Sequence, residues 1–123
     1  MRRSQIPLLL LLLTLLPFLL TGQNQSKKEK AEEANSRSVQ GIVRDPSDNV
    51  VTSAIVQLKN LKTLQVRSYI TRDDGRYLFQ GLGTNIDYEL RAEHQTMSSP
   101  VRTLSVFDSR KKAVINLKLE PKK

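Results

Sequence analysis

The sequence predicts an all-β domain that folds as a seven-stranded antiparallel β-sandwich and is preceded by a signal peptide and a polar spacer. Three observations support this prediction. Apolar and polar residues alternate with a period of two from residue 39 onward, turn-forming residues separate the alternating runs, and no stretch after residue 37 keeps a helical period. Many short strands joined by frequent turns are typical of a sandwich.

The first residues have the layout of a secretory signal. A basic start, Met1-Arg2-Arg3, precedes an apolar run from Leu8 to Leu20, and this order is typical of a leader. As a helix the run would reach only about 20 Å, which is short of the roughly 30 Å of a bilayer core. Gly22 suits the residue before a cleavage site. We therefore expect a signal peptide, with a retained membrane anchor as the alternative.

The region after the leader is polar and has no aliphatic side chain larger than alanine. It has no apolar stripe with which to pack on a domain, so we expect a flexible spacer here. The remaining residues suit one domain with one hydrophobic core. The predicted organisation is a signal peptide at 1–22, a polar spacer at 23–37, the β-sandwich at 38–120 and a basic tail at 121–123.

Composition points to an exported protein with a basic surface. The chain of 123 residues has 20 Lys and Arg against 12 Asp and Glu, a formal net charge of +8, and no cysteine. A small exported domain without disulfides fits a bacterial route, so we expect a periplasmic, outer-membrane-associated or secreted protein. The positive charge could attract an anionic partner, but it is spread along the chain and also serves solubility.

The predicted strands are short alternating runs separated by turns. The Asp74-Gly75 turn leads into a strand that places Tyr77 and Phe79 on one face, which is typical of a hairpin. We expect the glycines of 81–83 to end this strand and residues 94–100 to form a polar loop. The aromatic residues, Phe107 included, are expected to serve the core. The predicted strands are 39–44, 54–59, 66–71, 77–79, 88–92, 101–107 and 114–119.

Four blocks of the sequence have a characteristic order. Residues 39–45, 54–58, 71–82 and 88–92 read V-x-G-x-V-x-D, A-x-V-x-L, T-x-x-D-G-x-Y-x-F-x-x-L and Y-x-L-x-A. This order resembles the carboxypeptidase regulatory-like domain family, whose fold is the transthyretin-like (prealbumin-like) sandwich. Asp48-Asn49 stands where that family usually has a glycine, and a glycine-aromatic pair is replaced by residues 93–97. The resemblance implies a non-catalytic accessory module that stabilises a neighbour or binds protein or carbohydrate.

The residues give little support for catalysis, a metal or another cofactor. His94 is the single histidine and there is no cysteine, so a zinc site would need distant carboxylates. We expect His94 to face solvent in a loop. Aspartates at two turns could hold calcium, but aspartate also suits such turns. A small hydrolase on this fold, which would depend on His94, is the least favoured alternative.

We therefore predict a non-enzymatic exported module without metal or cofactor that binds a protein or carbohydrate partner in the cell envelope. The alternative is a structural envelope protein without a soluble ligand. Nucleic acid is not expected as a partner, and membrane contact is expected only through a retained leader. The predicted ligand surface consists of basic residues: Arg72, Arg76, Arg91, Arg102, Arg110, Lys111 and Lys112.

Overall fold

The computed structural model describes residues 35–122, which form ten short strands. No helix among these residues is long and apolar enough to span a membrane. The predicted signal peptide and all of the predicted spacer before Asn35 lie outside the described residues. The strands are β1 (Ser36–Arg44), β2 (Ile55–Asn60), β3 (Val66–Ile70), β4 (Arg76–Gly83), β5 (Tyr88–His94), β6 (Met97–Ser98), β7 (Arg102–Leu104), β8 (Lys112–Val114), β9 (Leu117–Lys118) and β10 (Glu120–Pro121).

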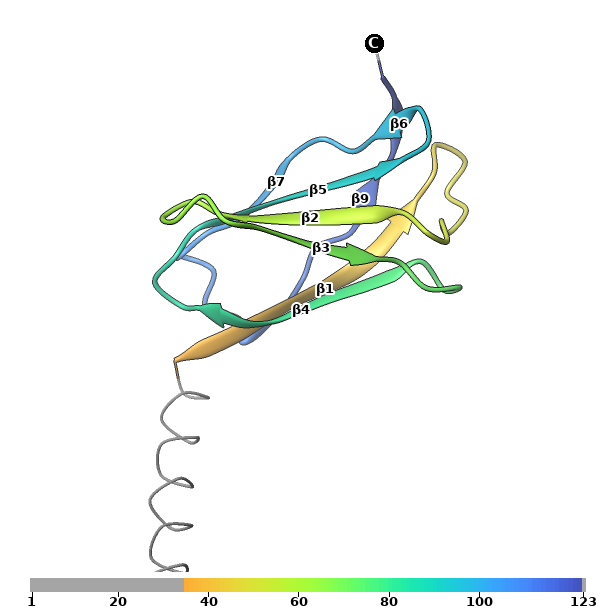
Figure 1. The fold of residues 1–123 in the computed structure, drawn as a ribbon. Coiled ribbons are helices and arrows are strands. Elements are labelled where there is room, and N and C mark those ends of the chain that lie inside the picture. Colours follow the sequence, from red (N-terminus) through yellow and green to blue (C-terminus); the bar gives the residue numbers. More distant parts are fainter. Residues whose placement is uncertain (1–34, 123) are drawn as a thin grey trace, which may run out of the picture. The chain divides into compact units, whose positions relative to one another are not determined.

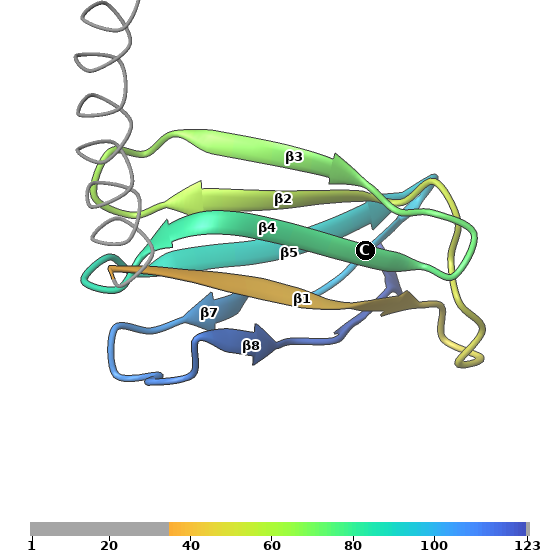
Figure 2. The same ribbon diagram turned by 90° about the horizontal axis from the view of Figure 1, so that it is seen from below.

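The strands form two sheets that face each other across a common core (Figures 1 and 2). In the first sheet, β4 and β8 flank β1, and β9 pairs with the end of β1 beyond β8. In the second sheet the order is β10-β6-β5-β2-β3, and β7 pairs with β5 beside β6. This arrangement confirms the predicted all-β sandwich.

The pairing differs from a purely antiparallel sandwich at β1. Both β8 and β9 run parallel to β1, because the connection after β7 crosses to the first sheet at the end where β1 begins (Figure 2). β1 and β8 therefore start from the same end of the molecule. The last segment then passes from β9 to β10, which pairs with β6 in the second sheet, so the predicted final strand is divided between the sheets.

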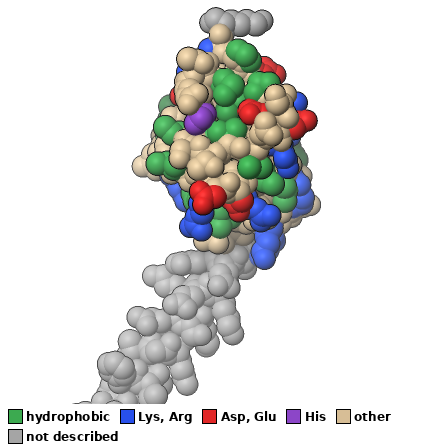
Figure 3. Space-filling model, turned by 90° about the vertical axis from the view of Figure 1, so that its right-hand side faces the viewer, with side chains coloured by type: hydrophobic (Ala, Val, Ile, Leu, Met, Phe, Trp, Pro, Cys, Tyr) green, Lys and Arg blue, Asp and Glu red, His purple; other side chains and the backbone are tan. Residues whose placement is uncertain are grey.

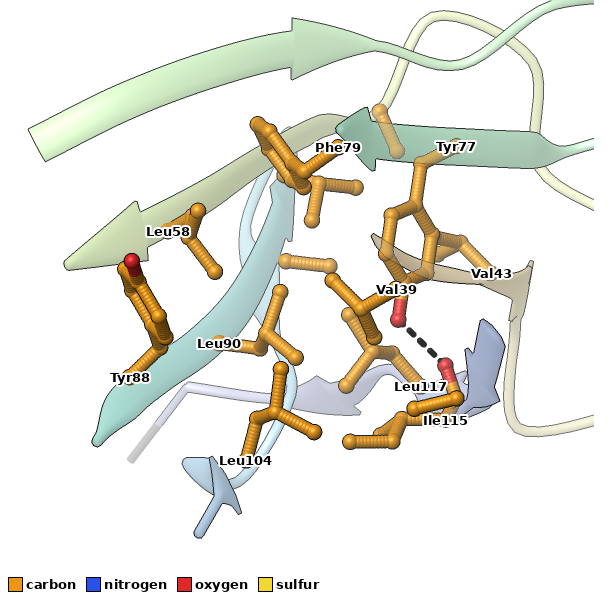
Figure 4. Packing of buried hydrophobic residues seen from close by; sticks show 14 of the residues in the cluster. Val39, Val43, Leu58, Tyr77, Phe79, Tyr88, Leu90, Leu104, Ile115 and Leu117 are labelled. Carbon is orange, nitrogen blue, oxygen red and sulfur yellow. Dashed lines mark hydrogen bonds between the residues drawn. The ribbon is translucent and has the colours of Figure 1, made fainter. Parts of the chain in front are cut away.

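The core lies between the sheets and follows the period-two alternation that the sequence shows. Figure 4 shows side chains of both sheets meeting there. Burial of each large apolar side chain stabilises the fold by roughly 1.5–3 kcal/mol. The buried apolar residues are Val39, Val43, Val51, Ala54, Val56, Leu58, Tyr77, Phe79, Leu82, Tyr88, Leu90, Ala92, Leu104, Ala113, Ile115, Leu117 and Leu119.

Gly41 allows the central strand β1 to pass between Tyr77 and the backbone of Ile115. Gly41 is the register partner of Tyr77. A Cβ built on Gly41 would overlap the carbonyl oxygen of Ile115 and lie 2.8 Å from the Tyr77 ring. The Tyr77 hydroxyl donates a hydrogen bond to that same carbonyl (Figure 4). The absence of a side chain at Gly41 therefore brings β1, β4 and the final segment together.

The expectation that the glycines of 81–83 end the fourth strand holds at Gly83 but not at Gly81, which lies within the strand. β4 continues to Gly83, and the register with β1 shifts between Arg37 and Val39. Gly81 lies opposite this shift with a positive φ of 70°, a backbone conformation that suits glycine. The glycine therefore forms a β-bulge, which bends the strand without ending it.

The expectations for His94 and Phe107 are also wrong. His94 belongs to β5 and not to a loop, because the chain turns sharply at Gln95 and Thr96 into β6; its Nδ1 is buried without a hydrogen-bond partner. Phe107 is 93% exposed and does not serve the core. The strand predicted to include it ends at Leu104, and a turn follows in which the Asp108 N–H donates to the Ser105 carbonyl (3.1 Å).

Candidate binding surfaces

The basic residues predicted to form one ligand surface lie on separate parts of the sandwich. Arg72 and Arg76 together line an open depression of about 400 Å³. Arg91 lines a second depression of about 260 Å³ on the outer face of the second sheet, and Arg102 lines a third of about 140 Å³. Residues 110–112 lie in and just after the loop between β7 and β8. The structure therefore brings Arg72 and Arg76 together but does not gather all seven residues.

Several of these cations are paired with carboxylates. Arg76 lies 3.5 Å from Asp74 and Arg91 lies 2.8 Å from Glu93, in exposed pairs that contribute little to stability. Arg110 donates to both carboxylate oxygens of Asp108, and these bonds lower the pKa of Asp108 to about 2. Figure 3, which views the end carrying the β1–β2 and β3–β4 connections, shows acidic as well as basic side chains.

The largest described depression lies over the outer face of the first sheet. One row across this face consists of Leu78, Gln40 and Val114, which are register partners. In the next row the Ile42 N–H donates to the side-chain oxygen of Asn116 (3.0 Å). The floor therefore alternates apolar and amide side chains, and Arg72 and Arg76 line the same depression. Such a surface suits a polar, extended ligand.

β3 is an edge strand with one open side. Its only neighbour in the sheet is β2. The Thr71 N–H donates to the Ala54 carbonyl and the Asn60 N–H donates to the Gln65 carbonyl, each over 2.9 Å. Because bonding directions alternate along an antiparallel strand, the backbone groups of Val66, Ser68 and Ile70 point to the open side.

The side chains of β3 make this edge suitable for another strand. Val66 is 53% exposed and Ile70 is 64% exposed, and their outward positions flank Ser68. The strand contains no proline or glycine, the residues that usually interrupt pairing at an edge. Its single charge, Arg67, is occupied elsewhere.

Arg67 and Tyr69 cover the gap between β3 and β4. The Arg67 guanidinium lies 5.5 Å from the centre of the Phe79 ring and donates to the Gln80 carbonyl (3.2 Å). Tyr69 meets Phe79 edge-on, with ring centroids 6.1 Å apart. These contacts occupy the inward side chains of β3 and leave its outer edge uncovered.

A third feature, Arg37, was missed by the sequence analysis, which assigned it to the spacer. β1 begins at Ser36, and the Arg37 side chain is buried, with 4% exposure. Arg37 donates to the Gly83 carbonyl from Nε (3.2 Å), to the Ser105 and Asp108 carbonyls from Nη1 (2.8 and 3.1 Å), and to the Ile86 carbonyl from Nη2 (2.8 Å). The alternation of Val39, Gly41 and Val43 extends back to Arg37 and places it inward, but its charge suggested exposure.

Asp87 joins these loops to the β2–β3 hairpin. Its carbonyl accepts from the Leu61 N–H (3.0 Å) and its carboxylate accepts from the Val106 N–H (2.7 Å). We call this end of the sandwich the Arg37 end. It consists of the start of β1 and the loops 61–65, 84–87 and 105–111, which lie together at the left of Figures 1 and 2.

A comparison with protein-family models places the whole sandwich in one family. The model described as carboxypeptidase regulatory-like domain matches residues 38–120. The chain belongs to this family. The resemblance seen in the sequence motifs is therefore confirmed. No curated protein matches the chain.

Solved structures share the fold of this carboxypeptidase regulatory-like domain at low sequence identity. The Bacillus anthracis TIE protein matches with a TM-score of 0.54 and 17% identity, over 71% of this chain and 17% of that one. Catechol 1,2-dioxygenase from Acinetobacter sp. ADP1 matches with a TM-score of 0.53 and 10% identity, over 71% of this chain and 53% of the enzyme. The chain thus spans about half or less of these structures, and the likeness shows the fold alone.

The acidic turns of this carboxypeptidase regulatory-like domain are held by their own aspartates. One carboxylate oxygen of Asp45 accepts from the Ser47 and Asn49 N–H groups (2.9 and 3.0 Å), and Asp74 accepts from the Arg76 N–H (3.1 Å). These bonds are typical of turns that aspartate stabilises. Within residues 35–122 no group of three or more His, Asp or Glu side chains is arranged to hold a metal ion.

Proposed function

We propose that this chain is an exported, non-enzymatic binding module of the bacterial cell envelope, and that it binds an extended segment of a partner protein along β3. The observation that carries the proposal is the open edge of β3, with exposed Val66 and Ile70 on either side of Ser68. An extended segment can add to such an edge through main-chain hydrogen bonds, while pockets for its alternate side chains give selectivity.

The surroundings of β3 supply contacts for the side chains of an added segment. Tyr69 and Arg72 line the largest described depression together with Leu78 of β4. A segment paired with β3 would direct alternate side chains toward this region and the others outward beside Val66 and Ile70. The apolar and cationic groups of this depression favour a segment with mixed apolar and acidic residues.

Two further arguments support a binding role without catalysis. The family model that the chain matches describes a regulatory-like domain. The chain has one histidine and no cysteine, whereas a nucleophile activated by a neighbouring base is the usual requirement for covalent hydrolytic catalysis. Export is proposed from the leader-like sequence at residues 1–22.

Binding of a carbohydrate is a second candidate, favoured by the floor of the same depression. There Gln40 and Asn116 offer amide groups beside the apolar Ile42 and Val114. A glycan bound at this floor would depend on the two amides and would tolerate changes at Ser68. Replacing each amide residue by alanine and measuring binding of envelope polysaccharide would therefore distinguish the two candidates.

The experiment that tests the protein-binding proposal uses proline at the open edge. Because the Ser68 N–H points away from β2, Ser68→Pro leaves the native ladder intact while it removes a donor that an added strand needs. A photoreactive residue in place of Val66 reports the partner in the native envelope. We expect Ser68→Pro to lower the cross-linking yield about tenfold or more, because the added strand loses a main-chain hydrogen bond. A tenfold loss corresponds to about 1.4 kcal/mol of binding free energy.

The matched control is Ser68→Ala. This variant changes the same exposed side chain but keeps the Ser68 N–H that an added strand would bind. It should keep the cross-linking yield. Equal yields for Ser68→Pro and the native chain, or an equal loss for Ser68→Ala and Ser68→Pro, would rule out addition at β3.

A further inference from the structure

The Arg37 end exposes large apolar side chains on loops that the fold holds rigid. Phe107 is 93% exposed and Leu64 is 63% exposed. They stand on different loops, which Asp87 connects through its bonds to the Leu61 and Val106 N–H groups. Leu61, at 38% exposure, adds a third apolar side chain to this end.

The loop that carries Phe107 is fixed on both sides of the aromatic residue. The Phe107 N–H donates to the Ser105 hydroxyl (3.1 Å), and the buried Arg37 binds the Ser105 and Asp108 carbonyls. A buried guanidinium that binds four backbone carbonyls holds its neighbours strongly, because charged hydrogen bonds are stronger than neutral ones. The loop is thus preorganised, and an exposed phenylalanine on it needs no ordering when it binds.

The hairpin that carries Leu64 is fixed in the same way. The side-chain oxygen of Asn60 accepts from the Lys62 and Thr63 N–H groups (2.8 and 3.0 Å), and the Leu64 N–H donates to the Asn60 carbonyl (2.7 Å). Leu64 has a positive φ of 65°, where glycine or asparagine would be less strained. An exposed leucine at such a position adds nothing to the core, and its presence points to contact with another molecule.

Cationic side chains surround these apolar tips. Lys62 lies in the hairpin, and Arg110, Lys111 and Lys112 follow Phe107; all four residues are exposed. Arg110 pairs with Asp108 over 2.7 Å, and the Asp87 carboxylate is turned toward the Val106 N–H. Lys62 and Lys112 therefore add positive charge at this end.

We propose that the Arg37 end docks on the surface of an anionic phospholipid bilayer. Apolar residues at the tips of separate loops, flanked by lysine and arginine, suit insertion among headgroups, where the apolar parts leave water and the cations meet phosphate. Leu64 and Phe107 protrude from the ends of their loops, at 63% and 93% exposure, which suits insertion better than the lining of a groove. The proposal is independent of binding at β3.

Docking at the Arg37 end, where β1 starts (Figure 2), leaves the sides of the sandwich free. In this orientation β3 lies along the side of the sandwich and its open edge remains accessible from the aqueous phase.

The test measures vesicle binding by the chain from Gln23 onward. This part contains the complete core, since every buried apolar residue lies between Val39 and Leu119. We expect co-sedimentation with vesicles of phosphatidylcholine mixed with phosphatidylglycerol, weaker binding to phosphatidylcholine alone, and a decrease at high salt. Phe107→Ser should weaken binding roughly ten- to a hundredfold, the loss expected for one aromatic side chain that leaves water.

Two further variants locate the contact. The chain has no tryptophan, so Phe107→Trp introduces a single indole whose emission should shift to the blue with anionic vesicles and be quenched by brominated lipid. The matched control is Ile70→Trp, at an exposed apolar residue of β3 away from the Arg37 end (64% exposure); its emission should not change. Absence of vesicle binding, equal binding by Phe107→Ser, or equal shifts for both tryptophans would overturn the proposal. Specific cross-linking of Phe107 to a protein without vesicle binding would do the same and would indicate a protein partner.

Discussion

Tyr77 illustrates how one residue connects three parts of the fold. Its ring packs over Gly41 and lies 6.0 Å from that of Phe79, and its hydroxyl donates to the Ile115 carbonyl. Burial raises the pKa of the Tyr77 phenol above its ordinary value of 10.0, and the positive charge of Arg102 opposes this rise only in part. The fold therefore requires the neutral phenol.

The raised pKa of Tyr77 predicts a loss of stability in alkali. The stabilisation that comes from burying the neutral phenol is complete below pH 10, the pKa in the unfolded chain, and decreases as the pH rises above it. Urea unfolding between pH 8 and roughly pH 11 should show this decrease in the native chain and a smaller one in Tyr77→Phe. Tyr77→Phe should itself cost about 1–2 kcal/mol at neutral pH, because the buried Ile115 carbonyl loses its donor. Parallel pH profiles for the two proteins would contradict this account.

At the residue scale, alternation predicted the inward residues well and the loop residues poorly. Tyr77 and Phe79 lie inward, as period-two patterning requires. Phe107 is exposed because the strand ends at Leu104, and hydrophobicity alone does not reveal where a strand ends. Arg37 lies inward because four carbonyls from distant loops converge on it, and such convergence depends on tertiary structure that local sequence does not record.

At the scale of elements, β1 organises the first sheet. It pairs with β4 on one side and with β8 and β9 on the other. The sequence indicated β1 and β4 by their alternation, but the parallel pairing with β8 was not predictable from it. That pairing depends on the direction in which the 105–111 loop, tied by Arg37 and Asp87, returns the chain to the first sheet.

The crossing at Gly41 predicts a strong effect of a single methyl group. Gly41→Ala should destabilise the domain by roughly 2–3 kcal/mol, because its Cβ would overlap the Ile115 carbonyl, which the rigid core cannot move away at low cost. Gly81→Ala is the control, since a Cβ there meets no atom within 4 Å and only the positive φ is strained. Its cost should be about 1 kcal/mol. Chemical denaturation of both variants measures the difference, and a larger loss for Gly81→Ala would contradict the packing argument.

At the scale of the whole molecule, the two ends of the sandwich differ in how they are held. The end with the β1–β2 and β3–β4 turns combines local bonds of Asp45 and Asp74 with the uncharged Thr71 hydroxyl, which donates to the Val51 carbonyl (2.7 Å). The Arg37 end is held by long-range bonds from one buried side chain. The predicted domain boundary at residue 38 fell just after this residue, since the family patterns begin at Val39.

Truncation tests the importance of the Arg37 end. Chains that begin at residue 23 and at residue 35 should unfold with the same free energy, because the core and Arg37 are present in both. A chain that begins at residue 38 should lose roughly 2–4 kcal/mol, since four partly buried carbonyls lose a charged donor. Arg37→Ala in the longer chain should reproduce most of this loss. Equal stability of all four proteins would show that the buried guanidinium does not hold the loops.

The family model establishes the family and the structure establishes the fold. The open edge of β3 is the feature on which the proposed activity depends. The most direct test is amide hydrogen exchange in the free protein and in the complex with the partner that cross-links at position 66. Addition of a strand should slow exchange at the Val66, Ser68 and Ile70 amides, which point to the open side of β3. Unchanged exchange at these three amides in a saturated complex would contradict binding at β3.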